Sequence, residues 1–171
     1  VREFSGWENI RINAALLGMD SRQIRSKLDE IVAFCGLEDA LSQPIKIYSS
    51  GMVLRLGFAV AAMSDPEILL VDEVLAVGDY RFYAKCLEKV HGLKRNGTAI
   101  ILVSHDLQQV AQVCEEGLWL EGGSLRAAGP MEQVLHDYRR HFSESPENGS
   151  GKTQESGDLA PKRASSKSLM A

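Results

Sequence analysis

An unbroken apolar run, residues 68–71, ends at two adjacent acids, Asp72 and Glu73. A continuous apolar run, unlike an alternating one, predicts a strand buried on both faces of a parallel sheet. Residues 98–103 repeat the pattern, and His105 follows shortly after them. We therefore expect two buried strands with polar residues at their carboxyl ends, which is where ligands bind in open α/β sheets.

Helical spacing of apolar residues predicts helices on either side of these strands. Asp20, with Gln23 three residues later, predicts a capping box at the start of one of them. The helix that follows Gly51 is apolar nearly all round, with Arg55 as its only charge, so we expect it to be deeply buried. The other elements expected are helices over 7–17, 20–35, 79–95 and 106–114, a hairpin over 118–127, and a last helix starting at Gly129-Pro130.

The order of these elements predicts an α/β fold. Residues 64–142 read as strand, helix, strand, helix, hairpin and helix, which implies a parallel sheet with crossover helices. Residues 1–63 form an α-helical subdomain that precedes it. Residues 143–171 are rich in Ser, Gly, Glu, Lys and Pro and predict a disordered tail.

Composition narrows the class of protein. The 171 residues are 44% apolar and 25% charged with a net charge of −4, values that are ordinary for a globular domain. No basic cluster indicates a nucleic-acid partner, and no apolar run approaches the ~20 residues that span a bilayer. No signal peptide opens the chain, and the cysteines are few and far apart. We therefore expect a cytoplasmic protein with reduced core thiols.

The polar residues after the two strands permit a structural and a chemical interpretation. Asp72 could cap the next helix, or it could hold Mg²⁺ while Glu73, on the opposite side of the chain, orients a water for phosphoryl transfer. His105 could be a satisfied core or capping residue, or it could bind a γ-phosphate at the end of the neighbouring strand.

Ser49, Ser50 and Gly51 stand at the start of the apolar helix. They could form a plain N-cap. Alternatively, free backbone N–H groups and the positive end of the helix could bind a phosphate, with Gly51 allowing its close approach.

Four motifs in this order resemble the C-terminal part of the nucleotide-binding domain of an ABC transporter. YSSGM (48–52) is similar to the signature motif, ILLVDE (68–73) to Walker B, and AVGD (76–79) to the D-loop. His105 corresponds to the switch histidine. The resemblance covers residues 4–142.

Details of these motifs resemble one subfamily. The signature departs from the common LSGGQ at Tyr48, Ser50 and Met52. This variant, together with GWENI (6–10) and DEVLAVGD (72–79), is similar to ATP-binding subunits that export polysaccharides such as O-antigen, capsule or teichoic acid.

The resemblance implies an ATPase in which two domains dimerise head to tail around two ATP molecules. It implies that Asp72 holds Mg²⁺, that Glu73 polarises the attacking water, and that His105 senses the γ-phosphate. In the site of the partner, Ser49, Ser50 and Gly51 would bind the γ-phosphate.

The resemblance also implies contacts beyond the ATP. Asp79 would link the two sites across the dimer. The helical subdomain would contact transmembrane permease subunits, which would hold the protein on the cytoplasmic face of the membrane.

The phosphate-cradling Walker A loop, GxxxxGK[ST], does not precede these motifs. Residues 148–153 imitate its end, but Pro146 stands where its first glycine belongs, and no predicted strand leads into it. We therefore expect an N-terminally truncated domain that exposes apolar surface, is marginally folded or prone to aggregate, and has no ATPase activity alone.

Three hypotheses remain open at this stage. The chain is part of the ATPase subunit of a polysaccharide exporter, or it is a non-catalytic pseudo-ATPase or dimerisation partner. A soluble ABC protein of DNA repair or translation is the third, although the tandem domains or large insertions of such proteins do not occur here.

Overall fold

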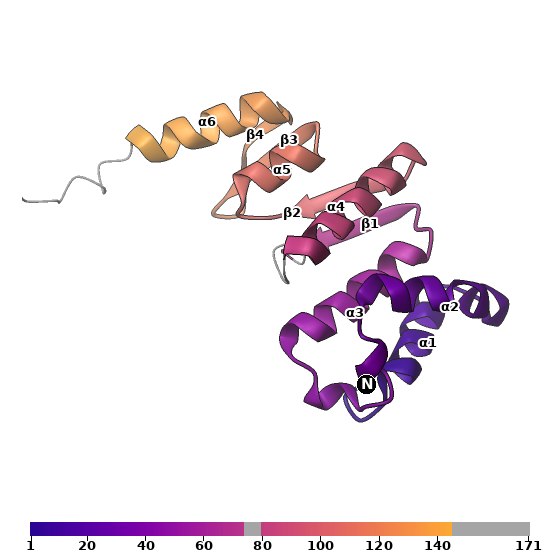
Figure 1. The fold of residues 1–171 in the computed structure, drawn as a ribbon. Helices are drawn as coiled ribbons and strands as arrows, with labels where there is room; N and C mark the ends of the chain where they lie inside the picture. The colour runs from indigo at the N-terminus through magenta and orange to yellow at the C-terminus, as the bar shows by residue number, and fades with distance from the viewer. Residues whose placement is uncertain (74–79, 145–171) are drawn as a thin grey trace, which may run out of the picture.

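The computed structural model describes residues 1–73 and 80–144. Figure 1 shows helices α1 to α3 gathered at one end, the strands β1 and β2 with α4 in the middle, and a hairpin with α6 at the other end. The last helix reaches Glu144, so it includes the first two residues of the expected tail. The rest of that tail, and residues 74–79, lie outside the described residues.

The helical part, residues 1–63, folds as expected. The predicted capping box at Asp20 and Gln23 is confirmed, because each residue's side chain accepts a hydrogen bond from the other's backbone N–H. A second capping box, Ser5 with Glu8, begins the first helix. The elements are α1 (Gly6–Leu16), α2 (Ser21–Cys35), the 3₁₀ turns η1 (Glu38–Ala40) and η2 (Ile45–Ile47), and α3 (Ser50–Met63).

The α/β part has the predicted order of elements. Strands β1 and β2 pair in parallel, with Leu70 opposite Ile101, and α4 is the crossover between them. The hairpin is longer than expected and includes Gly129 and Pro130, so the last helix begins one residue later than predicted. The elements are β1 (Ile68–Asp72), α4 (Tyr80–Arg95), β2 (Ala99–Val103), α5 (Leu107–Val113), β3 (Glu116–Glu121), β4 (Ser124–Pro130) and α6 (Met131–Glu144).

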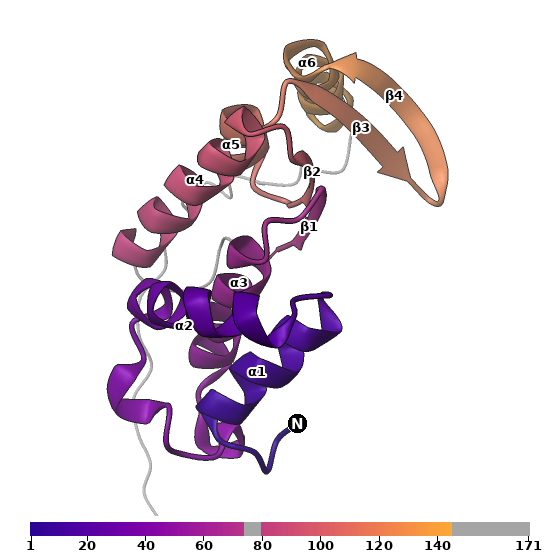
Figure 2. The same ribbon diagram turned by 90° about the vertical axis from the view of Figure 1, so that its right-hand side faces the viewer.

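The prediction that the two strands are buried on both faces is wrong for this structure. Leu69 and Val71 pack into a core with α4, but Ile68 and Leu70 are exposed. In Figure 2, α4 and α5 lie on the same side of β1 and β2, and no described element covers the other side. The open face therefore shows alternate apolar residues of both strands to solvent: Ile68, Leu70, Ile101 and Val103.

Helix α3 is buried only over its second half. Leu56, Phe58 and Val60 belong to the core, whereas Val53 is exposed. The expectation of a helix buried all round is therefore wrong for its first turn, where only Met52 packs against the core. Its carboxyl end leads into β1 through Asp65, whose φ is 49°.

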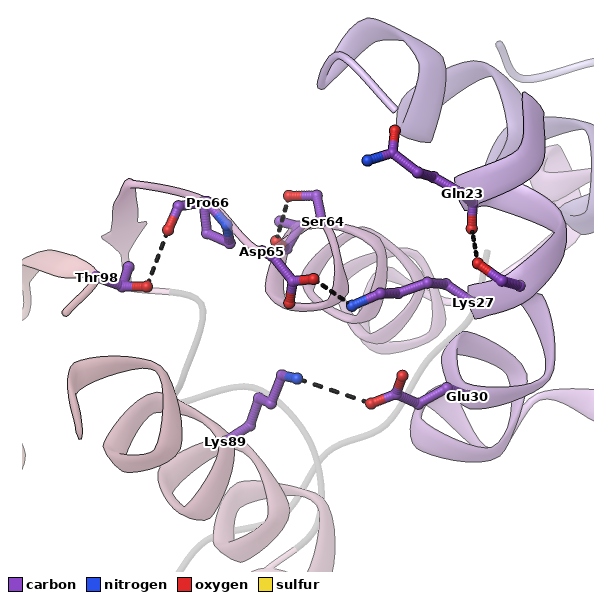
Figure 3. A network of polar contacts seen from close by, with 10 residues as sticks. Gln23, Lys27, Glu30, Ser64, Asp65, Pro66, Lys89 and Thr98 are labelled. Carbon is purple, nitrogen blue, oxygen red and sulfur yellow. Dashed lines mark hydrogen bonds and ion pairs between the residues drawn. The ribbon is translucent and has the colours of Figure 1, made fainter. Parts of the chain in front are cut away.

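Polar contacts join the helical part to the α/β part around this turn (Figure 3). Lys27 of α2 pairs with Asp65, and Lys89 of α4 lies 3.8 Å from Glu30 of α2. Next to this junction and within the α/β part, the Thr98 hydroxyl donates to the Pro66 carbonyl oxygen at 2.9 Å. Exposed ion pairs contribute little stability each, so the apolar contacts carry most of the energy of this junction.

A close contact between α1 and the segment before α3 fixes Tyr48. Its hydroxyl donates to the Ala40 carbonyl oxygen at 2.6 Å, and the ring is buried. A Cβ added at Gly6 would lie 2.5 Å from the Tyr48 hydroxyl oxygen and 3.0 Å from the Leu41 Cα atom. Glycine is therefore needed at position 6 to let α1 approach the residue that leads into α3.

We predict that Gly6→Ala destabilises the chain by about 1–3 kcal/mol, because the added methyl group overpacks this contact. Tyr48→Phe removes the hydroxyl and should cost about 1 kcal/mol. In the double variant, the missing Tyr48 hydroxyl no longer clashes with the added methyl group. Its loss of unfolding free energy should therefore be smaller than the sum of the two single losses. Urea unfolding of the four proteins measures this, and strictly additive costs would contradict the proposed contact.

The neighbouring leucines of β1 provide a matched test of the open face. Leu69 is 5% exposed and Leu70 is 70% exposed. In the 171-residue chain, Leu69→Ala should cost about 2–5 kcal/mol of unfolding free energy. Leu70→Ala should change it by less than about 0.5 kcal/mol and should reduce self-association. Equal costs in denaturant titrations would show that the second face of the sheet is covered.

Candidate functional site

The acids after β1 and the histidine after β2 meet at one edge of the sheet. Asp72 is in register with Val103, and the Glu73 backbone N–H donates to the Val103 carbonyl oxygen at 2.9 Å. Just beyond this last hydrogen bond, His105 Nδ1 lies 3.0 Å from Glu73 Oε1. With an ionised carboxylate, which only accepts hydrogen bonds, the ring nitrogen is the donor.

The backbone of Glu73 has an unusual conformation. Its φ is 53°, in the left-handed region that residues with a side chain rarely adopt. Such a conformation costs free energy, and it occurs preferentially where a side chain must be held in a particular direction. Here it accompanies the turn of the chain out of β1, at the point where the Glu73 carboxylate contacts His105.

The contact between Glu73 and His105 is open to solvent. Their side chains are 61% and 79% exposed, so the pair contributes little to folding stability. The contact instead places a carboxylate and an imidazole side by side at one strand edge, where they can bind and orient a polar ligand. Asp72 is exposed beside them.

The oxygen donors of Asp72 and Glu73 fit Mg²⁺ in its usual setting. Mg²⁺ in nucleotide sites is bound by one or two carboxylates, with water and phosphate oxygens completing the octahedron. Within residues 1–73 and 80–144, no group of three or more His, Cys, Asp or Glu side chains forms a metal cage. The two adjacent carboxylates at this edge suit a metal ion that arrives with a phosphate.

Ser49 is the N-cap of α3. Its hydroxyl oxygen accepts a hydrogen bond from the Met52 N–H at 3.2 Å, as the structural interpretation of this motif requires. Ser50 and Gly51 form the first turn, which contains no acidic residue. The first N–H groups of a helix have no partner within it, so this uncharged turn also meets the physical requirements of an anion site.

Tyr48 precedes this cap and holds it in place. The phenol is buried, and burial raises the pKa of Tyr48, so the hydroxyl remains a neutral hydrogen-bond donor to Ala40. Tyr48 is one of the positions where the motif departs from LSGGQ. Its place in the structure is a packing position on which the orientation of the Ser49–Gly51 turn depends.

The structure brings together some of the expected site residues and not others. Asp72, Glu73 and His105 share the strand edge, whereas Ser49, Ser50 and Gly51 lie on another element, at the start of α3. Asp79 and the rest of the segment 76–79 lie outside the described residues.

Arg55 is a residue whose position the sequence did not reveal. Its guanidinium carbon lies 5.0 Å from the centroid of the Phe82 ring, which joins α3 to the first turn of α4. A lone charge in an otherwise apolar helix was the available signal, since charged residues are rarely buried without a specific contact.

The cysteines are distant from this edge and are free. Cys35 and Cys86 are buried and Cys114 is partly buried, which agrees with the expectation of reduced core thiols. Burial raises the pKa of Cys86 to about 12, so its thiol stays protonated and unreactive at neutral pH.

Across the part of the chain that the structure covers, every helix is too short or too polar to cross a bilayer. No protein-family model matches the chain. Individual proteins do match. The O-antigen export system ATP-binding protein RfbB of Myxococcus xanthus is 45% identical over 82% of the chain, and RfbB of Klebsiella pneumoniae is 39% identical over 81%. The teichoic acids export ATP-binding protein TagH of Enterococcus faecalis is 42% identical over 82% of the chain.

A solved structure has the same fold. The ATP-binding subunit of an ABC transporter superposes with a TM-score of 0.71 and 25% identity, covering 84% of this chain and 58% of that one. The expected α/β fold with its helical subdomain is thereby confirmed.

The chain spans only part of each relative, from 32% of the Myxococcus protein to 56% of the Klebsiella protein. Within that span it matches proteins for O-antigen and teichoic acid export, as the variant signature indicated, and the solved neighbour supports the same kinship. The chain therefore belongs to the family of ABC transporter ATP-binding proteins.

Proposed function

We propose that this chain is part of an ATPase subunit that drives polysaccharide export. The proposal is carried by one observation, the 3.0 Å contact between Glu73 and His105 at the shared edge of β1 and β2. Both side chains are largely exposed, so the contact contributes little to folding stability. The relatives named for O-antigen and teichoic acid export support the substrate class.

In the proposed site, Glu73 accepts the proton of the attacking water or orients it. His105 holds the carboxylate in position in the present arrangement and can donate a hydrogen bond to a γ-phosphate oxygen. Asp72 would hold the Mg²⁺ that accompanies ATP; this ion offsets the negative charge that the phosphates carry during transfer. All three roles depend on the position of Asp72, Glu73 and His105 at the shared edge of β1 and β2.

Ser49, Ser50 and Gly51 serve the site of a second copy. The first turn of α3 is well suited to a γ-phosphate, but it belongs to the helical part of the chain, whereas Glu73 and His105 belong to the α/β part. A head-to-tail homodimer removes this separation, since each copy's turn can approach the other copy's strand edge. Asp79 would link the two sites.

The remaining partners follow from the same proposal. The helical part, residues 1–63, would contact the transmembrane permease subunits, which would hold the protein at the cytoplasmic face of the membrane. No nucleic acid is required. The phosphate-cradling Walker A loop would come from polypeptide outside these residues, and the 171-residue chain alone would therefore not hydrolyse ATP.

We predict that Glu73→Gln in the natural-length protein lowers the ATPase rate by about 10²–10⁴-fold, because the amide cannot accept the proton. Binding of ATP should be retained, since the phosphate contacts are unchanged. A phosphate-release assay and an ATP-binding titration measure the two effects. Undiminished turnover would contradict the role of Glu73, and a natural-length protein that never hydrolyses ATP would favour the pseudo-ATPase hypothesis.

The dimer can be tested by mixing two inactive variants. Glu73→Gln disables the strand edge, and Gly51→Asp places a negative side chain against the phosphate position. If the turn acts in trans, a mixed dimer has one doubly defective site and one intact site. Random mixing should then restore roughly a quarter of the wild-type rate. If both motifs acted in the same copy, every site would be defective and the mixture would stay inactive.

A further inference from the structure

Arg55 lies one helical turn after Gly51 and is the only charged residue of α3. Its guanidinium group packs over the ring of Phe82, with 5.0 Å between the guanidinium carbon and the ring centroid. Phe82 is buried and belongs to the first turn of α4. The contact therefore joins the first half of α3 directly to the start of α4.

The contact closes a cluster of aromatic rings from three helices. The Phe34 ring of α2 lies 6.0 Å from Phe58 of α3 and 5.7 Å from Phe82 of α4, and Phe58 lies 6.5 Å from Phe82. The pairs with Phe82 are edge-on, an arrangement that aromatic rings prefer. Arg55 extends this cluster toward the amino end of α3.

Arg55 is partly buried. Burial raises the pKa of Cys35 and of Cys86, and the positive charge of Arg55 opposes this rise at both thiols. Cys35 belongs to α2 and Cys86 to α4, the helices that carry Phe34 and Phe82 of the aromatic cluster. Desolvating a guanidinium costs free energy, which the stacking on Phe82 and its other contacts offset.

We propose that Arg55 is a positioning residue that locks the amino ends of α3 and α4 together. The turn at Ser49–Gly51 begins α3. The proposed function places this turn against the γ-phosphate in the partner's site, and the catalytic part of this inference rests on that assignment. Arg55 itself touches neither ATP nor the reacting atoms.

The contact between Arg55 and Phe82 makes the first half of α3 and the first turn of α4 move as one body. Without it, the turn of α3 could shift while α4 stays attached to the sheet through its own core contacts. The phosphate-binding turn would then reach the partner's site in a less favourable position, although nucleotide bound at that site's strand edge would be unaffected. We therefore expect a variant that lacks this contact to hydrolyse ATP more slowly while binding ATP as tightly as the wild type.

The test uses the natural-length protein with Arg55→Met, Phe82→Leu and both changes together. Each single variant should lower kcat on the order of 10-fold and leave KM for ATP within about 2-fold. The double variant should be no worse than the more impaired single variant, because both remove the same contact. Arg55→Lys, which keeps the cation but not the planar stack, should retain more activity than Arg55→Met.

Arg95→Met is the matched control, because Arg95 is exposed at the other end of α4. It should leave kcat and KM unchanged. A kcat of Arg55→Met equal to that of wild type, or a loss explained by a raised KM, would overturn the catalytic part of the proposal. A wild-type protein without ATPase activity would instead refute the proposed function.

Amide hydrogen exchange tests the lock itself and requires no activity. Arg55→Met should increase exchange both in peptides from the first half of α3 and in peptides from the first turns of α4, while peptides from α6 stay as protected as in wild type. An increase confined to one of the two helices, or absent from both, would show that Arg55 does not hold them together.

Discussion

The parallel pairing of β1 with β2 is the constraint on which the rest of the site depends. Backbone hydrogen bonds place Asp72 opposite Val103, and one further bond carries Glu73 past the end of β2. The chain then turns with Glu73 in a left-handed conformation, and His105 arrives beside it. Neither side chain needs burial or a neighbouring charge to reach this place, because the register of two strands already determines it. Crossover helix α4 secures the pairing by covering one face of the strands.

Much of this arrangement could be predicted from residues 68–73 and 98–105. Apolar runs that end in polar residues predict strands, and the carboxyl ends of adjacent parallel strands share one edge. What could not be predicted was burial. An apolar run such as residues 68–71 indicates that both faces of the strand are apolar, but it does not indicate which element covers each face. In this structure α4 and α5 cover one face, so Leu70 is exposed although its neighbour Leu69 is buried.

At the start of α3, too, the sequence predicts the local structure but not the packing that orients it. Ser49 is an N-cap by its own chemistry, and the sequence predicted that possibility correctly. Its orientation depends on residues that no local pattern connects: Gly6, whose lack of a side chain admits Tyr48, and Arg55, which meets Phe82 of a helix that follows β1. Packing across different helices, which periodicity does not encode, thus decides where the turn at Ser49–Gly51 points. The roles in binding and hydrolysing ATP remain predictions for every site residue: Ser49, Ser50, Gly51, Asp72, Glu73, Asp79 and His105.

The two proposed halves of the nucleotide site lie on different parts of the chain, Ser49–Gly51 at the start of α3 and Glu73 with His105 at the sheet edge, and the account requires two copies of the protein to bring them together. A structure of the natural-length Glu73→Gln protein with Mg²⁺ and ATP tests this most directly. The account predicts that one γ-phosphate contacts Ser49 and Gly51 of one copy, and the Asp72-bound Mg²⁺ and His105 of the other. A γ-phosphate held by both sets of residues from the same copy, or by neither set, would contradict it.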